Sequence, residues 1–473
     1  MNRKIALLLA SAVLFALGSC SNIDPEDPNI EITEESAGKL ISAQFIESVP
    51  LAQQINGLVG SVVESERLSQ LIEGLSGNAE VISYRIVYTT KDNKGKTIQL
   101  SGDVAWMYKG EEKTTLESVS LFHPAFATAE EHALEYEQYC FPGRSIHGAL
   151  VVYPHYQGVF EGRKEEWIEG RPVTTSELIL KARQAVDLEV AALSFIESLP
   201  DVEMNQDYYT ENMGLSCGAG TALATCYILE NDPDYIDINS EKIHLYSTYL
   251  CEGCYSYSDL LPSLMKIYDY DPDDMSSFSS MEDFKPTAML SFIIGTFDTW
   301  KGIEKGDGTK YFDGIEDVRE YFDAAFLSCD NLYADDGTHV TDPIQFYRDG
   351  LLDHHSRIFK KVGFISSTMI NRNFVNADGE LDEANPHIKA LLDAMKNNDK
   401  IIEGWHPETM LTIAHSYDDE FVPVEQATDL YKNLKGSFFD TKVQIKLISG
   451  CDHTEGNQVF AITDLILSKH PCR

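Results

Sequence analysis

Residues 214–218 read Gly214-Leu215-Ser216-Cys217-Gly218, and a run of small residues, Ala219 to Ala222, follows them. In a G-x-S-x-G sequence the serine stands on a strained turn between a strand and a helix, and the small neighbours let that turn close. The pattern predicts a short strand ending at Leu215, a nucleophilic Ser216, and a helix that runs to about Glu230. The pentapeptide alone is a weak signal, because a chain of 473 residues with 31 glycines also produces it in turns without chemistry.

Strand and helix patterns alternate on both sides of this turn. Residues 80–108 alternate between apolar and polar side chains around Asp92-Asn93-Lys94-Gly95, which is typical of a β-hairpin. Further strands are predicted at 119–122, 149–153, 243–250, 410–414 and 443–448, and a helix at 176–197. Such alternation predicts an α/β fold with a doubly wound, mostly parallel sheet.

The same patterns predict the organisation of the chain. Apolar residues recur at spacings of three and four over 36–78, which predicts an N-terminal helical arm. The alternation stops between 255 and 400, where an aromatic-rich insertion falls between two strands, and we expect it to be a helical cap over the carboxyl edge of the sheet. The predicted parts are a signal peptide (1–20), a tether (21–35), the arm (36–78), the core (79–254 and 401–473) and the cap (255–400).

The N-terminus has the features of a bacterial lipoprotein signal. Positive charge at Arg3 and Lys4 precedes an apolar segment, and Leu17-Gly18-Ser19-Cys20 resembles the site at which a lipoprotein is cut and acylated. The apolar segment is short for a membrane span. We therefore expect lipidation at Cys20, a membrane anchor through that lipid, and a location in the bacterial cell envelope as an outer-membrane lipoprotein, periplasmic or surface-exposed. An ordinary signal peptide and a transmembrane anchor are the alternatives.

Composition excludes some partners and leaves other questions open. The formal net charge is −39, which repels polyanions, so nucleic acid is not an expected partner. Eight further cysteines permit disulfides outside the cytoplasm, but their pairing and the oligomeric state do not follow from sequence. Cys251-Glu252-Gly253-Cys254 is a lone C-x-x-C with no second ligand pair at metal spacing, so no metal site is expected.

A serine nucleophile needs a base, and the base needs an acid to orient it. After the strand at 410–414 the chain continues His415-Ser416-Tyr417-Asp418-Asp419, and after the strand at 443–448 it continues Ser449-Gly450-Cys451-Asp452-His453. Both groups follow the carboxyl ends of strands, beside the expected turn. We assign Asp419 as the acid and His453 as the base, with Asp418 and Asp452 as alternative acids.

These residues carry a resemblance to a known family. Asp419 followed by Val422-Pro423, in a loop opened by His415, resembles the H-G-x-x-D-x-x-V-P loop of α/β-hydrolases, and Gly450-x-x-His453 resembles their terminal G-x-x-H. The likeness covers roughly residues 80–470 and is nearest to secretory lipases and esterases. It implies a Ser216–Asp419–His453 triad, no cofactor, and an oxyanion hole.

The oxyanion hole departs from the family pattern. The chain reads His123-Pro124-Ala125-Phe126 where relatives have H-G, and proline has no N–H to donate. The resemblance therefore implies the backbone N–H of Cys217 as one donor, and that of Ala125 or Phe126 as the other. His155, where relatives carry an aspartate, receives no catalytic role. The thiol of Cys217 is expected to pack in the core rather than to act as a nucleophile.

We expect a serine hydrolase that cleaves carboxylic esters, either small molecules or acyl groups linked to a polymer, through an acyl-enzyme. Two alternatives stay open. A peptidase of the prolyl-oligopeptidase type is one, although no propeller-like repeat precedes the core. A non-catalytic surface lipoprotein that keeps the hydrolase scaffold for binding is the other.

Overall fold

A computed structural model describes residues 37–53, 77–92, 95–110, 113–124, 148–156, 177–265, 280–328, 330, 332–333, 337–348, 369–399, 404–436, 441–457 and 459–460. Cys20, with the predicted signal peptide and tether, lies outside these residues, as do Ala125 and Phe126. The lipid anchor and the second oxyanion donor therefore stay predictions. In the part of the chain that is described, no helix has the length and apolar character needed to cross a bilayer.

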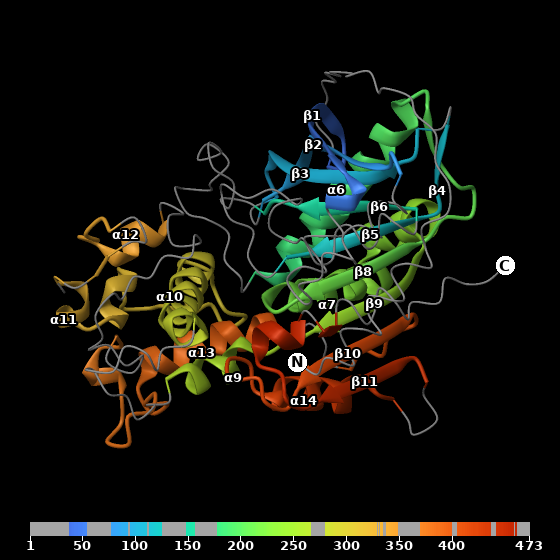
Figure 1. Cartoon of the computed structure of the whole chain (residues 1–473). Helices are drawn as coiled ribbons and strands as arrows, with labels where there is room; N and C mark the ends of the chain where they lie inside the picture. The colour runs from blue at the N-terminus through green and yellow to red at the C-terminus, as the bar shows by residue number, and fades with distance from the viewer. Residues whose placement is uncertain are drawn as a thin grey trace.

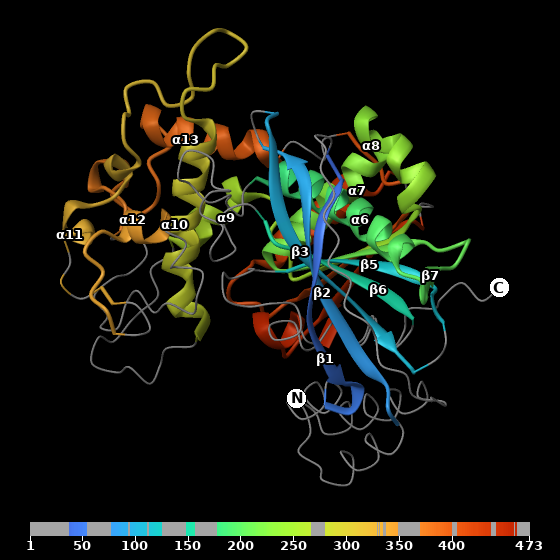
Figure 2. The ribbon, with the colours of Figure 1, turned by 90° about the horizontal axis from the view of Figure 1, so that it is seen from above.

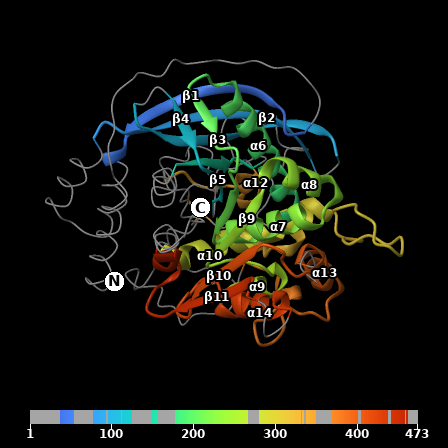
Figure 3. The same ribbon diagram turned by 90° about the vertical axis from the view of Figure 1, so that its right-hand side faces the viewer.

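The centre of the molecule is a nine-stranded sheet in the order β1-β2-β3-β6-β5-β8-β9-β10-β11. Figure 3 shows β1 and β2 at one end of the sheet and β10 and β11 at the other. All pairings from β6 to β11 are parallel, whereas β1, β2, β3 and β6 pair antiparallel. The strands are β1 (Leu40–Pro50), β2 (Glu80–Lys91), β3 (Thr97–Tyr108), β5 (Ser118–His123), β6 (Ala149–Pro154), β8 (Thr210–Leu215), β9 (Leu245–Cys251), β10 (Met410–Ser416) and β11 (Val443–Ile448). The short strands β4 (Thr114–Leu116) and β7 (Val202–Met204) form a separate parallel pair.

Helices pack on the sheet because its central strands are apolar on both faces. Three helices pack their apolar residues against one face of the sheet: α6 (Leu178–Ser198), α7 (Cys217–Asn231) and α14 (Val424–Leu434). On the other face, Met213 and Leu215 of β8 share a cluster with Leu51 and Phe460. Figure 2 shows α6, α7 and the short α8 (Pro233–Ile238) together on one side of the strands. The hairpin and the alternating strands and helices predicted from the sequence are confirmed.

Between β9 and β10 the chain leaves the sheet for a helical insertion. It contains α9 (Tyr257–Leu264), α10 (Ser280–Trp300), α11 (Ala324–Leu327), α12 (Pro343–Arg348) and α13 (Pro386–Asp399), with 3-10 turns at Val318–Tyr321 and Arg372–Phe374. In Figures 1 and 2 this insertion stands beside the sheet. Of the aromatic residues in this insertion, Tyr257, Phe292 and Phe297 are fully buried. Tyr268, Tyr270 and Phe278 lie outside the described residues.

Polar contacts fix the first helix of the insertion against the core. Asp399, at the end of α13, accepts hydrogen bonds from the backbone N–H groups of Tyr257 and Ser258 at 3.0 and 3.1 Å. Gln426 of α14 accepts from the N–H groups of Tyr255 and Ser256 at 3.0 and 2.8 Å. These bonds satisfy donors at the start of α9 that no helical carbonyl serves. The role of the insertion as a cap, and the domain boundaries, stay predictions.

The N-terminal arm is a correction, because residues 40–50 form strand β1 and not the predicted helix. Strand β1 pairs antiparallel with β2 along its whole length, with register shifts between Leu40 and Ser42 and between Phe45 and Glu47. A bulge adds one residue to the two-residue repeat of a strand. Leu40 and Ala43, which are both buried, therefore stand three residues apart, and the sequence looks helical. Residues 54–76 of the predicted arm lie outside the described residues.

Candidate active site

Ser216 stands at the corner between β8 and α7, where the sequence places it. Its φ angle is +52°, a left-handed conformation that non-glycine residues rarely adopt and that costs about 1–3 kcal/mol. The corner is held by hydrogen bonds from the Ser216 N–H to the Cys251 carbonyl (2.8 Å) and from the Ala219 N–H to the Ser216 carbonyl (3.0 Å). The strained conformation is retained because these hydrogen bonds fix the backbone. This backbone conformation directs the serine side chain out of the strand.

The two glycines of the pentapeptide are needed for close packing. A Cβ on Gly214 would lie 2.2 Å from the carbonyl oxygen of Gly218, and a Cβ on Gly218 would lie 2.2 Å from the carbonyl oxygen of His123. Both neighbours are backbone atoms, which cannot rotate away as a flexible side chain does. The glycines therefore let β8, α7 and the end of β5 approach one another at the serine.

We expect Gly214→Ala and Gly218→Ala to lower the free energy of unfolding by about 1–3 kcal/mol or more, through overpacking against backbone. Thermal unfolding followed by circular dichroism measures the effect. Gly306→Ala is the matched control, because a Cβ there meets nothing within 4 Å. If the midpoints of all three variants coincide with that of the wild type, the close-packing argument fails.

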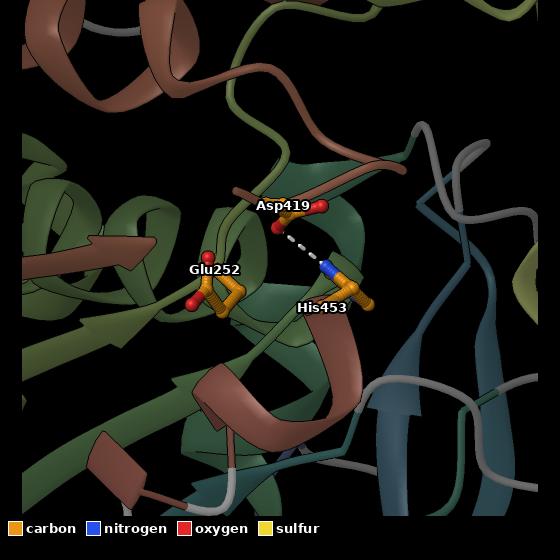
Figure 4. Close-up of side chains that lie close together, drawn as sticks. All are labelled: Glu252, Asp419 and His453. Carbon is orange, nitrogen blue, oxygen red and sulfur yellow. Dashed lines mark hydrogen bonds and ion pairs between the residues drawn. The ribbon is translucent and has the colours of Figure 1, made fainter. Parts of the chain in front are cut away.

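The three predicted residues lie together although they are far apart in the chain. His453 Nε2 is 2.9 Å from Ser216 Oγ, and His453 Nδ1 is 2.6 Å from Asp419 Oδ2. Figure 4 shows the second contact, with His453 pointing toward Asp419. An ionised carboxylate only accepts, so the Nδ1 proton of His453 is donated to Asp419 and its Nε2 lone pair faces the serine hydroxyl. All three side chains are nearly or fully buried, with Ser216 3% and His453 4% exposed.

Asp419 is held in one position from both of its oxygens. Oδ1 accepts the backbone N–H groups of Phe421 and Val422 at 2.8 and 2.7 Å, and Oδ2 accepts from His453. Burial alone would raise the pKa of Asp419, but the hydrogen bond and charge of His453, with smaller contributions that include the Val422 N–H, hold that pKa below its ordinary value. The carboxylate is therefore ionised at neutral pH and can accept the Nδ1–H of His453.

The alternative acids lie in other hydrogen bonds. Asp418 Oδ2 accepts the N–H of Gly450 at 2.5 Å and joins the loops after β10 and β11. Asp452 Oδ1 accepts the N–H of Glu455 at 2.8 Å, as an N-cap does at the start of the helical turn that carries His453. Neither contact leads to the ring of His453. His155, on the antiparallel side of the sheet, lies 3.3 Å from the buried Asp103.

One side of the predicted oxyanion hole is described. Cys217 is the first residue of α7, and the first N–H groups of a helix have no partner within the helix. Its side chain is fully buried, 4.0 Å from the sulfur of Cys254, so the thiol packs in the core as expected. His123 and Pro124 pack against Gly218. The residue that precedes Ala125 and Phe126 in the chain therefore lies next to the turn that carries Ser216.

Two residues at the site were not predicted from the sequence. Glu252 follows β9 and is fully buried, and one of its carboxyl oxygens lies within 4.8 Å of an Asp419 oxygen and of a His453 ring nitrogen. Asn457 Nδ2 lies 3.4 Å from His453 Nε2 and donates to the His453 carbonyl at 3.0 Å. The signal for Glu252 was its place after a strand; the C-x-x-C around it draws attention to the thiols instead. A helical spacing of four from His453 was the signal for Asn457.

Among the residues that the structure describes, the one group with spacing suited to a metal ion is Glu252, Asp419 and His453. The Nδ1 atom of His453 is already occupied by the proton that it donates to Asp419. A metal ion at this point would have to displace that proton, so the arrangement suits a proton relay better than a metal centre.

No protein-family model matches this chain, and no curated protein sequence matches it significantly. Solved structures do. The rice cell wall degrading esterase LipA from Xanthomonas oryzae has a TM-score of 0.63 at 15% identity, over 91% of this chain and 97% of LipA. Candida antarctica lipase A in its closed state has a TM-score of 0.54 at 9% identity, over 93% of this chain and 84% of the lipase. The chain therefore has the α/β-hydrolase fold, as the sequence predicts.

Proposed function

We propose that the protein is a serine hydrolase that cleaves carboxylic esters through an acyl-enzyme. The observation that carries the proposal is a chain of two hydrogen-bond contacts through the His453 ring. Asp419 Oδ2 lies 2.6 Å from His453 Nδ1, and His453 Nε2 lies 2.9 Å from Ser216 Oγ. The serine at its end stands on a strained strand-to-helix turn. A nucleophile, a base within hydrogen-bond reach and an acid that orients the base are the elements of this chemistry.

The geometry supports the following steps. Ser216 Oγ attacks the carbonyl carbon of the ester while its proton moves to His453 Nε2, and Asp419 stabilises the imidazolium that forms. The oxyanion is held by the Cys217 N–H and a second donor in the predicted loop. Collapse of the tetrahedral intermediate transfers the proton to the leaving alkoxide. Water then attacks the acyl-enzyme while one of its protons passes to His453 Nε2. Collapse of this second tetrahedral intermediate breaks the bond to Ser216 Oγ, which takes the proton back from His453 as the carboxylic acid leaves.

The named activities of the similar structures favour an ester over a peptide substrate. LipA is named an esterase and the Candida protein a lipase, and both share the fold over most of this chain. Esters are also chemically easier substrates, because an alkoxide leaves more readily than an amine anion. We propose ester hydrolysis at an envelope location, with the predicted lipid at Cys20 as the membrane anchor.

The test is turnover of p-nitrophenyl esters of increasing acyl length, measured beside aminoacyl-proline amides and labelling by a fluorophosphonate. Hydrolysis of at least one ester series, with labelling of Ser216 found by mass spectrometry, is expected. Cleavage of the amides without the esters would replace the proposal by a peptidase. No labelling and no turnover of either class would leave a binding protein on a hydrolase scaffold.

A further inference from the structure

Glu252 is a buried carboxyl group that the proposed mechanism does not use. It directly follows β9 and has a φ angle of +45°, a conformation that suits glycine far better than an L-amino acid. Its backbone N–H donates to the Ala414 carbonyl at 2.9 Å, so the turn is fixed between β9 and β10. An acidic side chain that is kept on an unfavourable backbone and sealed from water points to a role for the carboxyl group.

The contacts of Glu252 place it beside the acid of the proposed triad. Oε2 accepts the backbone N–H of Ser416 at 3.1 Å and lies 3.4 Å from His415 Nε2, which in turn is 3.5 Å from Asp419 Oδ2. The Nε2–H of His415 is donated to the Val422 carbonyl at 2.9 Å. Figure 4 shows Glu252 beside the Asp419–His453 pair.

Among the residues that the structure describes, the groups that act on Glu252 include no lysine or arginine. Burial is the largest cause that lowers the pKa of His415, so this ring is neutral at pH 7. The groups that face Glu252 are His415, Asp419, Glu420, His453 and the thiol of Cys451. Burial, then the hydrogen bond and charge of Asp419, raise the pKa of Glu252 to about 10. Two ionised carboxylates this close in a buried site would repel each other.

We propose that Glu252 is a positioning residue: an uncharged carboxylic acid that donates its proton in a hydrogen bond to the Asp419 carboxylate and keeps that carboxylate aligned with His453. The inference rests on the proposed function. Asp419 Oδ1 is already fixed by two backbone N–H groups. Glu252 supplies a donor on the remaining side, where His453 alone would hold the carboxylate. Because Glu252 is neutral, it orients Asp419 without adding a second negative charge beside the imidazolium.

The first test compares Glu252→Gln with Glu252→Gly. Gln keeps the shape and a donor, so kcat is expected within a few-fold of the wild type. Gly suits the backbone but removes the donor, so kcat is expected to fall about 10- to 100-fold with KM little changed, since misplacing a reacting group by about 1 Å costs about 100-fold. The thermal midpoint of the Gly variant reports whether the fold is intact. Equal kcat for Gly and wild type would overturn the positioning role.

The second test determines whether the carboxyl group of Glu252 is protonated or ionised. Gln does not alter the charge of a neutral group, so the acid limb of the kcat/KM profile should coincide with that of the wild type. An ionised Glu252 would favour the imidazolium, so its replacement would move that limb to lower pH and overturn the proposal. The infrared difference between wild type and Glu252→Gln at pH 7 should contain the carbonyl stretch of a protonated acid, and its absence would also overturn the proposal.

Different results would overturn the proposed function and the positioning role of Glu252. The infrared measurement needs no turnover, and the isosteric Gln variant keeps the test decisive if the Gly variant does not fold. A wild-type protein that neither hydrolyses esters nor reacts with a fluorophosphonate would overturn the proposed function, and the positioning role with it. An active enzyme in which Glu252→Gly keeps full kcat, or in which Glu252 is ionised, would overturn the positioning role alone.

Discussion

Replacing Ser216 with alanine is expected to lower kcat for ester hydrolysis by about 10⁶-fold, the loss that removal of a triad serine causes in a well-studied serine hydrolase. The variant loses the atom that forms the acyl bond, and the remaining His453 and Asp419 have no nucleophile to activate. KM should change little, because the serine oxygen contributes little to binding the ground state. Initial rates with a p-nitrophenyl ester, and fluorophosphonate labelling of the same samples, measure both consequences.

Cys217→Ala is the matched control for that variant. The two side chains are adjacent, but the Cys217 thiol is fully buried against Cys254, whereas Ser216 Oγ faces His453. Alanine keeps the backbone N–H at the start of α7, so labelling should persist and the rate should stay within about tenfold of the wild type. Loss of labelling in Cys217→Ala together with full labelling of Ser216→Ala would transfer the nucleophile to the thiol.

Asp419→Asn is expected to lower kcat by about 10⁴-fold while leaving fluorophosphonate labelling slow but detectable. The amide can present an N–H to His453 Nδ1, which favours the ring tautomer whose proton lies on Nε2. That tautomer has no lone pair toward Ser216 Oγ and cannot take its proton. The pH dependence of the residual rate, measured from initial velocities, distinguishes this loss of a base from a loss of folded protein.

Asp418→Asn and Asp452→Asn are the controls for the acid. Their carboxylates accept backbone N–H groups of Gly450 and Glu455, and an amide oxygen can replace each acceptor. Both variants should keep kcat within a few-fold of the wild type. A 10⁴-fold loss in either of them, with Asp419→Asn nearly active, would assign the acid to that residue and refute the present choice.

Sequence patterns were most informative where local rules act. The pentapeptide around Ser216 predicted the strand, the corner and the helix, because a strained turn needs glycines at fixed offsets, and β8 and α7 are found there. The arm was misread because a bulge between Leu40 and Ser42 puts the buried residues Leu40 and Ala43 three positions apart. A bulge depends on the partner strand, so the sequence of residues 40–50 alone does not reveal it.

The position of Glu252 in the site likewise depends on strand pairing and could not be predicted from the sequence. In the sequence it stands between two cysteines, far from the residues that follow β10 and β11. Parallel pairing of β9 with β10, and of β10 with β11, brings the ends of these strands to one edge. Only there does the carboxyl group meet Asp419 and His415, and only burial beside another carboxylate makes it neutral.

The sequence by itself determined the α/β class, the serine on the strand-to-helix turn, and the acid and histidine that follow β10 and β11. Each of these depends on residue types at short, fixed spacings, which hydrophobic periodicity and turn geometry require. The tertiary structure alone decided the row of hydrogen bonds from Asp419 through His453 to Ser216 and the place of Glu252 beside it. Serine and histidine stand 237 residues apart, and their 2.9 Å contact exists because the sheet aligns the carboxyl ends of its strands.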